Sequence, residues 1–174
     1  RCSATTRTMT RSPSDAAADR DDLLVAGFTA LAVVVHVLES AVPMPLPGIK
    51  PGLANLVVLV VLLRHGLRLA IWVALLRVVV ASLVLGSFLS PSFVLSLAGA
   101  AASLLVLGGT AKLPRCWFGP VSHSILAAFA HVLTQLVVVY IWLIPSPALW
   151  HLLPVFAAAA LVFGLVNGLA VQGL

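Results

Sequence analysis

The sequence predicts an all-α polytopic membrane protein, built as one bundle of six transmembrane helices. Of the 174 residues, 61% are hydrophobic and only 9% are charged, whereas about a quarter of the residues of a soluble domain are charged. The mean hydropathy is +1.16. The apolar residues form continuous segments without the alternation of a membrane β-barrel. Because backbone polar groups within a bilayer must be paired inside the protein, these segments are expected to be helices.

The chain divides into two parts by composition. Residues 1–22 are polar, small and mixed in charge, so they bury too little apolar area to offset the entropy of ordering and are expected to form a disordered cytoplasmic tail. Residues 23–174 are expected to form the transmembrane domain. At roughly 20 residues for each span, they leave no room for a separate soluble domain.

Each predicted span is an apolar run bounded by charged residues, glycine or proline. The first, residues 23–39, follows the acidic end of the tail and ends at Glu39. The second, residues 52–63, follows Pro51, and proline is favoured in the first turn of a helix. The third covers residues 69–89, and the fourth covers residues 91–110 from Pro91 onward. The fifth and sixth cover residues 121–143 and 152–171.

The cations predict the orientation of these spans. Arg64 and Arg68 lie between the second and third spans, and Lys112 and Arg115 lie between the fourth and fifth. Six spans place these residues and the tail on one side, so the positive-inside rule predicts that both termini are cytoplasmic. The expected location is a bacterial cytoplasmic membrane. The cations form no basic stripe with interleaved aromatic residues, so no nucleic-acid partner is expected.

The connection from Glu39 to Asn55 is the first candidate site, because it combines a carboxylate, a lysine and four prolines in an apolar sequence. The prolines favour an extended loop on the outer face. Lys50 and the N-terminus of the second span together suit an anion or a carboxylate. Alternatively, Lys50 extends to the membrane interface and pairs loosely with Glu39.

Arg77 is the second candidate, because it lies in the middle of the third span. A central arginine costs about 2.5 to 3.5 kcal/mol on insertion scales, so it should face the interior of the bundle. Two interpretations remain open. Glu39 neutralises Arg77 structurally, or Arg77 faces a cavity and holds an anionic ligand. The second is favoured by the excess of cations over acids past residue 22.

The fifth span carries a polar face made of His123, His131 and Gln135. The two histidines are roughly 12 Å apart along a helix, so they cannot share one metal ion, and no metal or other cofactor is expected. The polar face could serve hydrogen bonds between helices, or His131 and Gln135 could contact a ligand. Asn55 and Asn167 could complete a polar lining.

Two further patterns concern packing. His36 is expected to be a packing residue. Pairs of small residues mark surfaces where helices touch, with the first pair a possible docking face for a partner. These pairs are Ala26 with Ala30, Gly99 with Ser103, and Gly164 with Gly168.

The run E-x3-P-x-P-x-PGIK-x-GLAN, followed by SPSF-x-LSLAGA and by H-x3-Q in the fifth span, carries a resemblance over about residues 39–168. The chain resembles the Gx transporter family, many of whose members are labelled heptaprenyl diphosphate synthase component I. That family is similar to the substrate-binding S components of energy-coupling-factor transporters. The resemblance implies uptake of a small molecule and an energy-coupling membrane subunit that docks on Ala26 and Ala30. It implies ligand contacts at Lys50, Asn55, Arg77, His131 and Gln135.

Catalysis is not expected. Prenyl diphosphate synthesis needs clustered aspartates to hold magnesium, and only Glu39 is acidic past Asp22. No Walker A sequence is present, so ATP hydrolysis would have to come from a partner. The leading hypothesis is therefore a ligand-binding subunit or small transporter for an anionic molecule. A non-catalytic membrane subunit of isoprenoid metabolism and a purely structural protein are the alternatives.

Overall fold

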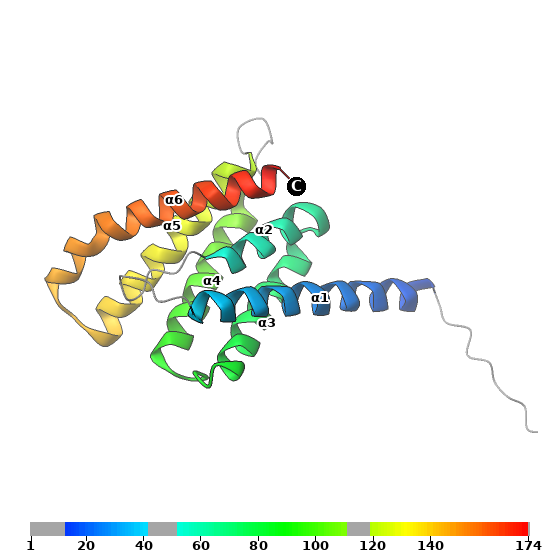
Figure 1. Cartoon of the computed structure of the whole chain (residues 1–174), viewed down its shortest axis with the longest axis horizontal. Helices are drawn as coiled ribbons and strands as arrows, with labels where there is room; N and C mark the ends of the chain where they lie inside the picture. The colour runs from blue at the N-terminus through cyan, green and yellow to red at the C-terminus, as the bar shows by residue number, and fades with distance from the viewer. Residues whose placement is uncertain (1–12, 42–51, 111–118, 174) are drawn as a thin grey trace, which may run out of the picture.

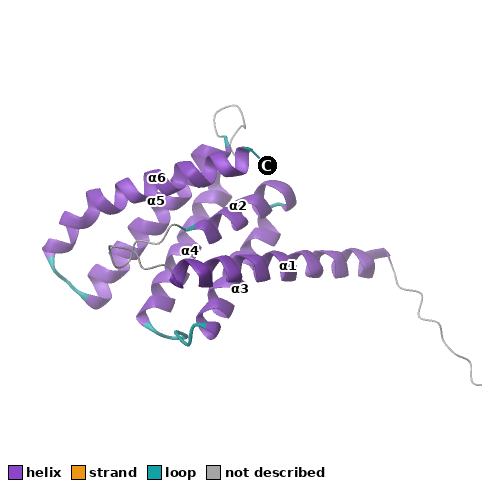
Figure 2. Cartoon of the chain, viewed as in Figure 1, coloured by secondary structure: helices purple, strands orange, loops and turns teal. Residues whose placement is uncertain are grey.

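The computed structural model describes residues 13–41, 52–110 and 119–173 (Figure 1). This part of the chain is helical or loop, without a strand (Figure 2), and the predicted all-α class is confirmed. The six α-helices are α1 (Pro13–Ala41), α2 (Leu53–His65), α3 (Leu67–Val84), α4 (Pro91–Thr110), α5 (Pro120–Val138) and α6 (Leu153–Gln172). A π-helical turn, η1 (Val139–Leu143), continues α5, and a 3-10 helix, η2 (Pro147–Leu152), precedes α6.

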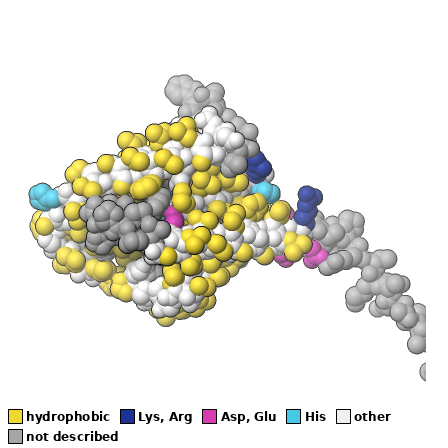
Figure 3. Space-filling view, in the orientation of Figure 1, with side chains coloured by type: hydrophobic (Ala, Val, Ile, Leu, Met, Phe, Trp, Pro, Cys, Tyr) yellow, Lys and Arg dark blue, Asp and Glu magenta, His cyan; other side chains and the backbone are white. Residues whose placement is uncertain are grey.

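Five of these helices are long and apolar enough to cross a membrane. The exception is α2, which is apolar but has only 13 residues. At 1.5 Å for each residue it is about 20 Å long, against roughly 30 Å for the hydrocarbon layer. Hydrophobic side chains dominate the face of the molecule in Figure 3. The structure therefore supports a membrane protein with five to six spans. The short α2 is the helix that departs from the expected pattern of six full-length spans.

Two predicted boundaries are corrected. The first helix begins at Pro13, so residues 13–22 are helical and do not belong to the predicted disordered tail. Proline is well suited to a first helical turn, and the three alanines that follow Asp15 are strong helix formers. The third helix ends at Val84 instead of Leu89, because a turn with a positive φ of 65° at Gly86 interrupts it. Residues 1–12 lie outside the described part.

The helices pack as two groups of three. The first group, α1 to α3, surrounds an apolar core in which Val61 and Val73 are fully buried. In the second group, α5 packs against both α4 and α6 (Figure 1). The groups join where α3 meets α4 and where α2 meets α6. The α2–α3 turn and the C-terminal end of α6 lie at one end of the bundle, and the α5–α6 connection lies at the other (Figure 1).

Close contact between α5 and α6 depends on the glycine pair that the sequence indicated. A Cβ atom on Gly164 would lie 2.9 Å from the Cα of Ile125, and one on Gly168 would lie 2.6 Å from the Cα of Val121. Neither neighbour can move without shifting the backbone of α5. The pair is thus a packing surface between helices, as small residues are in many membrane proteins.

Gly168→Ala is expected to destabilise the protein by about 1 to 3 kcal/mol, because the added methyl group forces α5 and α6 apart. The measurement is thermal unfolding of the detergent-purified protein. Gly27→Ala is the matched control, since a Cβ on Gly27 meets nothing within 4 Å. An unchanged unfolding temperature for Gly168→Ala would contradict this account of the contact.

Candidate functional site

A cavity of about 300 Å³ lies where the two groups of helices meet. Most of its walls are apolar, and the polar part is contributed by every one of the six helices. The polar lining residues are His36, Glu39, Asn55, Arg77, Ser92, Ser96, Ser103, Ser124, His131, Gln135 and Asn167. The volume is at the lower end of the range of about 300 to 1,000 Å³ that is usual for small-molecule sites.

One polar wall of the cavity is built around the start of α2. The first N–H groups of a helix have no partner within that helix, and here the buried carboxylate of Glu39 accepts a hydrogen bond from the backbone N–H of Leu53. Gly52 precedes the helix with a φ of 68°, a left-handed conformation that glycine adopts readily. The carboxylate at the end of α1 therefore caps α2.

This contact bears on the prediction that Lys50 and the N-terminus of the second span together suit an anion or a carboxylate. The favourable position for a negative charge at a helix N-terminus is taken by the protein's own Glu39. Lys50 and the extended proline loop lie outside the described residues. Their contribution to the site stays a prediction.

Arg77 approaches the same turn of α2 from α3. Its side chain is 5% exposed, and its Nη2 donates a hydrogen bond of 2.5 Å to Oδ1 of Asn55. The negative charge of Glu39 attracts the guanidinium. Arg77 therefore both lines the cavity and lies close enough to Glu39 for that carboxylate to offset its charge. That it holds an anionic ligand stays a prediction. Without these partners, a buried arginine would be strongly destabilising.

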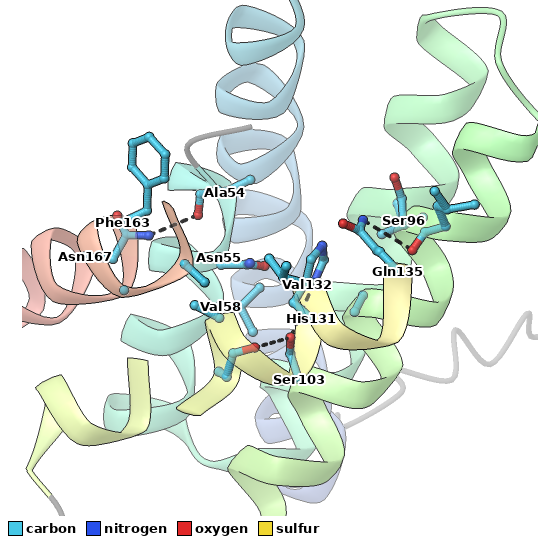
Figure 4. Close-up of a pocket in the computed structure, with 18 of the residues that line it drawn as sticks. Ala54, Asn55, Val58, Ser96, Ser103, His131, Val132, Gln135, Phe163 and Asn167 are labelled. Atoms are coloured by element: carbon cyan, nitrogen blue, oxygen red, sulfur yellow. Dashed lines mark hydrogen bonds between the residues drawn. The ribbon is translucent and has the colours of Figure 1, made fainter. Parts of the chain in front are cut away.

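Asn167 reaches the start of α2 from α6. Its Nδ2 donates to the carbonyl oxygen of Gly52 over 3.2 Å (Figure 4), and the same carbonyl accepts the backbone N–H of Asn55 at 2.8 Å. A carbonyl oxygen only accepts hydrogen bonds, so the amide of Asn167 must direct its NH₂ group toward Gly52 and its Oδ1 away from Gly52. We refer to Glu39, Gly52, Asn55, Arg77 and Asn167 as the α2 cluster. It joins α1, α2, α3 and α6.

Two atoms of the α2 cluster are buried and have no hydrogen-bond partner among the described residues. They are Nε of Arg77, which can only donate, and Oδ1 of Asn167, which accepts. Leaving a buried polar group unpaired costs about 1 to 3 kcal/mol. Unpaired groups of this kind are uncommon enough to need an explanation, and both belong to residues that line the cavity.

A second polar wall is formed by α4 and α5. The hydroxyl of Ser103 lies 3.0 Å from the carbonyl oxygens of both Gly99 and Ala127 and 3.4 Å from Nδ1 of His131 (Figure 4). Nε2 of Gln135 donates to the carbonyl of Leu95 over 3.4 Å. These bonds orient His131 and Gln135 between the helices while both still line the cavity.

Gly99 makes room for His131. A Cβ atom at this position would lie 2.7 Å from Cε1 of the imidazole, so the ring packs directly on the backbone of α4. The predicted small pair of Gly99 and Ser103 is therefore a packing surface that also positions a cavity residue.

Six of the seven predicted ligand positions line one cavity: Glu39, Asn55, Arg77, His131, Gln135 and Asn167. Whether they bind a ligand stays a prediction. His123, on the predicted polar face of the fifth span, instead has its Nδ1 2.9 Å from the carbonyl of Gly119 at the start of its own helix.

Sequence reasoning missed several residues of this site. His36 was expected to be a packing residue, but it lines the cavity. Ser92, Ser96 and Ser103 line it as well. With Gly99 they follow the i, i+4, i+7, i+11 spacing of one helix face, a signal that was present in the sequence.

The predicted docking pair, Ala26 and Ala30, lies on an exposed part of the surface of α1. Ala26 and Ala30 are exposed, whereas Ala32 on the same helix is fully buried in the apolar core. The pair is thus on a surface that the described part of the chain leaves uncovered. Its use by a partner stays a prediction.

Glu39→Ala is expected to lower the free energy of unfolding by about 1 to 3 kcal/mol, because Leu53 loses its acceptor and Arg77 loses a neutralising charge. Glu39→Gln should cost less, since its amide oxygen can still accept from Leu53. Chemical or thermal unfolding in detergent measures both. Equal losses for the two variants would show that the charge, and not the cap, is what stabilises this turn.

Gly99→Ala should destabilise the protein by about 1 to 3 kcal/mol through its clash with His131. The double variant Gly99→Ala/His131→Ala removes the ring that the methyl group meets. In a double-mutant cycle the two changes should therefore be less harmful together than their sum. Strict additivity would mean that the two residues are not in contact.

Comparisons with known proteins identify one family. Residues 28–174 match the family model described as "Heptaprenyl diphosphate synthase component I". No curated protein and no solved structure matches the chain.

Proposed function

Because the chain belongs to the heptaprenyl diphosphate synthase component I family, we propose a function from that premise and from the cavity. The protein is a membrane-embedded, non-catalytic subunit that binds a small molecule in the cavity beside the α2 cluster and takes part in its uptake. The observation that carries the proposal is that buried polar residues from all six helices converge on one cavity of about 300 Å³. Polar groups at such a depth are costly in a membrane protein and usually serve a function.

The geometry of α2 supports a binding role. Many transporters place their substrate at helices that are broken within the membrane, where helix ends and irregular backbone line the site. Irregular backbone at that depth is tolerated where protein or a cavity surrounds it. The short α2 likewise has its first turn in the wall of the cavity.

The small number of acidic residues supports a non-catalytic role in this proposal. Prenyl diphosphate chemistry depends on several carboxylates that hold magnesium on the diphosphate. Past Asp22 the only acidic residue in the sequence is Glu39, and its carboxylate already accepts a hydrogen bond from the backbone N–H of Leu53. A synthase activity would have to come from another subunit.

For transport, we propose the arrangement that the sequence resemblance implies. The protein acts as a ligand-binding subunit similar to the S components of energy-coupling-factor transporters. An energy-coupling membrane subunit docks on the exposed Ala26 and Ala30 of α1, and separate ATPases supply the energy. Both termini face the cytoplasm of a bacterial cell. This orientation is supported by the position of Arg64 and Arg68 at the α2–α3 turn.

The family description favours a second candidate, in which the protein is a non-catalytic subunit that holds a prenyl diphosphate for isoprenoid metabolism. Arg77 could contact the diphosphate, and the apolar walls could contact the chain. At about 10 to 15 Å³ of cavity volume for each water-sized group, the cavity of about 300 Å³ holds roughly 20 to 30 such groups. A heptaprenyl chain has about 35 carbon atoms beside its diphosphate, so part of that ligand would lie outside the cavity. For this reason we favour a smaller ligand.

The test is native mass spectrometry with metabolite extraction on detergent-purified wild-type protein and on Arg77→Met, which keeps the bulk of the side chain and removes its charge and donors. The expected result is a small polar molecule on the wild type that Arg77→Met loses. Arg68→Met is the matched control on the same helix, because Arg68 is exposed and does not line the cavity. It should retain the molecule.

Other outcomes of this experiment are decisive as well. A prenyl diphosphate on the wild type would favour the second candidate. A molecule that both arginine variants retain would place binding outside the cavity. A wild-type protein that is always empty, with variants that differ only in unfolding temperature, would contradict a binding function and leave a structural protein.

A further inference from the structure

A small second pocket lies beside the cavity, between α1, α3 and α4. It has a volume of about 20 Å³, and a water molecule needs about 10 to 15 Å³ of cavity volume. The pocket therefore holds one water-sized group. It meets the cavity at four residues that line both spaces: His36, Val78, Ser92 and Ser96. We refer to it as the side pocket.

The side pocket differs from the cavity in having mainly polar walls. Among the described residues, four serines and one histidine line it, together with three apolar residues. They are Ser82, Ser87, Ser92, Ser96, His36, Val78, Leu85 and Phe93. Glu39 and Arg77 line the cavity but not the side pocket. A small space with several polar partners suits an ordered hydrogen-bonding group, whereas cavities that stay empty are apolar.

Two serines of the side pocket differ in what they can offer to such a group. Oγ of Ser82 donates to the carbonyl oxygen of Val79 over 2.7 Å, so it can accept but not donate a further hydrogen bond. Oγ of Ser96 has no hydrogen-bond partner among the described residues, and unlike Nε of Arg77 it retains accessible surface. The hydroxyl of Ser96 can therefore donate as well as accept.

The position of Ser96 is fixed by the contact between α4 and α5. Nε2 of Gln135 donates to the carbonyl oxygen of Leu95, the residue before Ser96, and Figure 4 shows the side chains of Ser96 and Gln135 next to each other. Both residues line the cavity, and Ser96 lines the side pocket as well. A molecule whose body lies between the mostly apolar walls of the cavity is thus adjacent to the side pocket.

From these observations we infer that the side pocket is a subsite for one neutral hydroxyl group of the bound molecule. The inference rests on the proposed binding function and narrows its ligand class to alcohols. A hydroxyl has a single heavy atom, as the volume of the side pocket requires, and a group of that size filling it contacts both Ser82 and Ser96. It can donate to Oγ of Ser82 and accept from Ser96.

Other groups fit the side pocket less well. A carboxylate or a phosphate has several heavy atoms and is too large for a space that holds one water-sized group. A fluorine atom has a suitable size but cannot donate to Ser82. An ammonium group also has a suitable size, but it would be buried without an acidic residue among the described residues of this lining.

The experiment compares three probes that share one apolar body and differ in one heavy atom: cyclohexylmethanol, (fluoromethyl)cyclohexane and cyclohexylmethylammonium. Binding to the full chain in lipid nanodiscs is measured by saturation-transfer NMR titration, and partition into empty nanodiscs is subtracted. The alcohol is expected to bind at least about tenfold more tightly than either other probe, because sites built to hydrogen-bond a hydroxyl reject analogues that lack it.

Ser96→Ala tests the location of this preference. The advantage of the alcohol over the fluoride should fall to about threefold or less, since the donor in the side pocket is gone. Ser82→Ala removes the acceptor on the facing helix and should have the same effect, so the test does not depend on one variant. Ser122→Ala is the matched control, because Ser122 is a half-buried serine of α5 that lines neither space. It should keep the full preference.

Equal binding of the alcohol and the fluoride to the wild type would overturn the inference while the binding function stands. Preferred binding of the ammonium probe would do the same, as would failure of all three probes to bind. A preference for the alcohol that survives in both Ser96→Ala and Ser82→Ala would place the hydroxyl group elsewhere. The metabolite extraction on wild type and Arg77→Met reports separately on the proposed function, so the two failures can be distinguished.

Discussion

The structure depends on how the first turn of α2 satisfies its hydrogen bonds inside an apolar bundle. A helix that begins there has N–H groups without intrahelical partners, and hydrocarbon offers none. Glu39 supplies an acceptor from α1, and Asn167 of α6 pairs with the preceding carbonyl of Gly52. Once this carboxylate is buried, Arg77 can be buried beside it. The α2 cluster thereby joins four helices and sets one wall of the cavity.

The same arrangement sets the polar wall of the cavity. Glu39 caps α2, and its negative charge attracts Arg77. Nε of Arg77 and Oδ1 of Asn167 remain unpaired among the described residues. In mostly apolar surroundings a hydrogen bond is stronger than in water, and a polar group that is left unpaired is correspondingly more costly.

Much of the site could be found from the sequence, because polar residues inside apolar segments are rare and stand out. Arg77, Asn55, His131, Gln135 and Asn167 were each identified in this way, and the structure brings them to one cavity. The serine stripe of α4 was missed because serine is common in membrane helices and its hydroxyl can bond within its own helix. The start of α1 at Pro13 is also not apparent from the sequence, because the polar composition of residues 13–22 is typical of a disordered segment.

The class of this protein can be predicted from its sequence, because long apolar segments in hydrocarbon must form helices to pair their backbone polar groups. The sequence also indicates which residues need a polar environment, since an isolated charge or amide is costly in lipid. Which of these residues are partners of one another depends on how the helices pack. That Glu39 caps α2, that Arg77 bonds Asn55, and that Asn167 reaches Gly52 across 115 positions of the chain depend on the packing of four helices. Periodicity within one helix carries no information about which helix lies beside it.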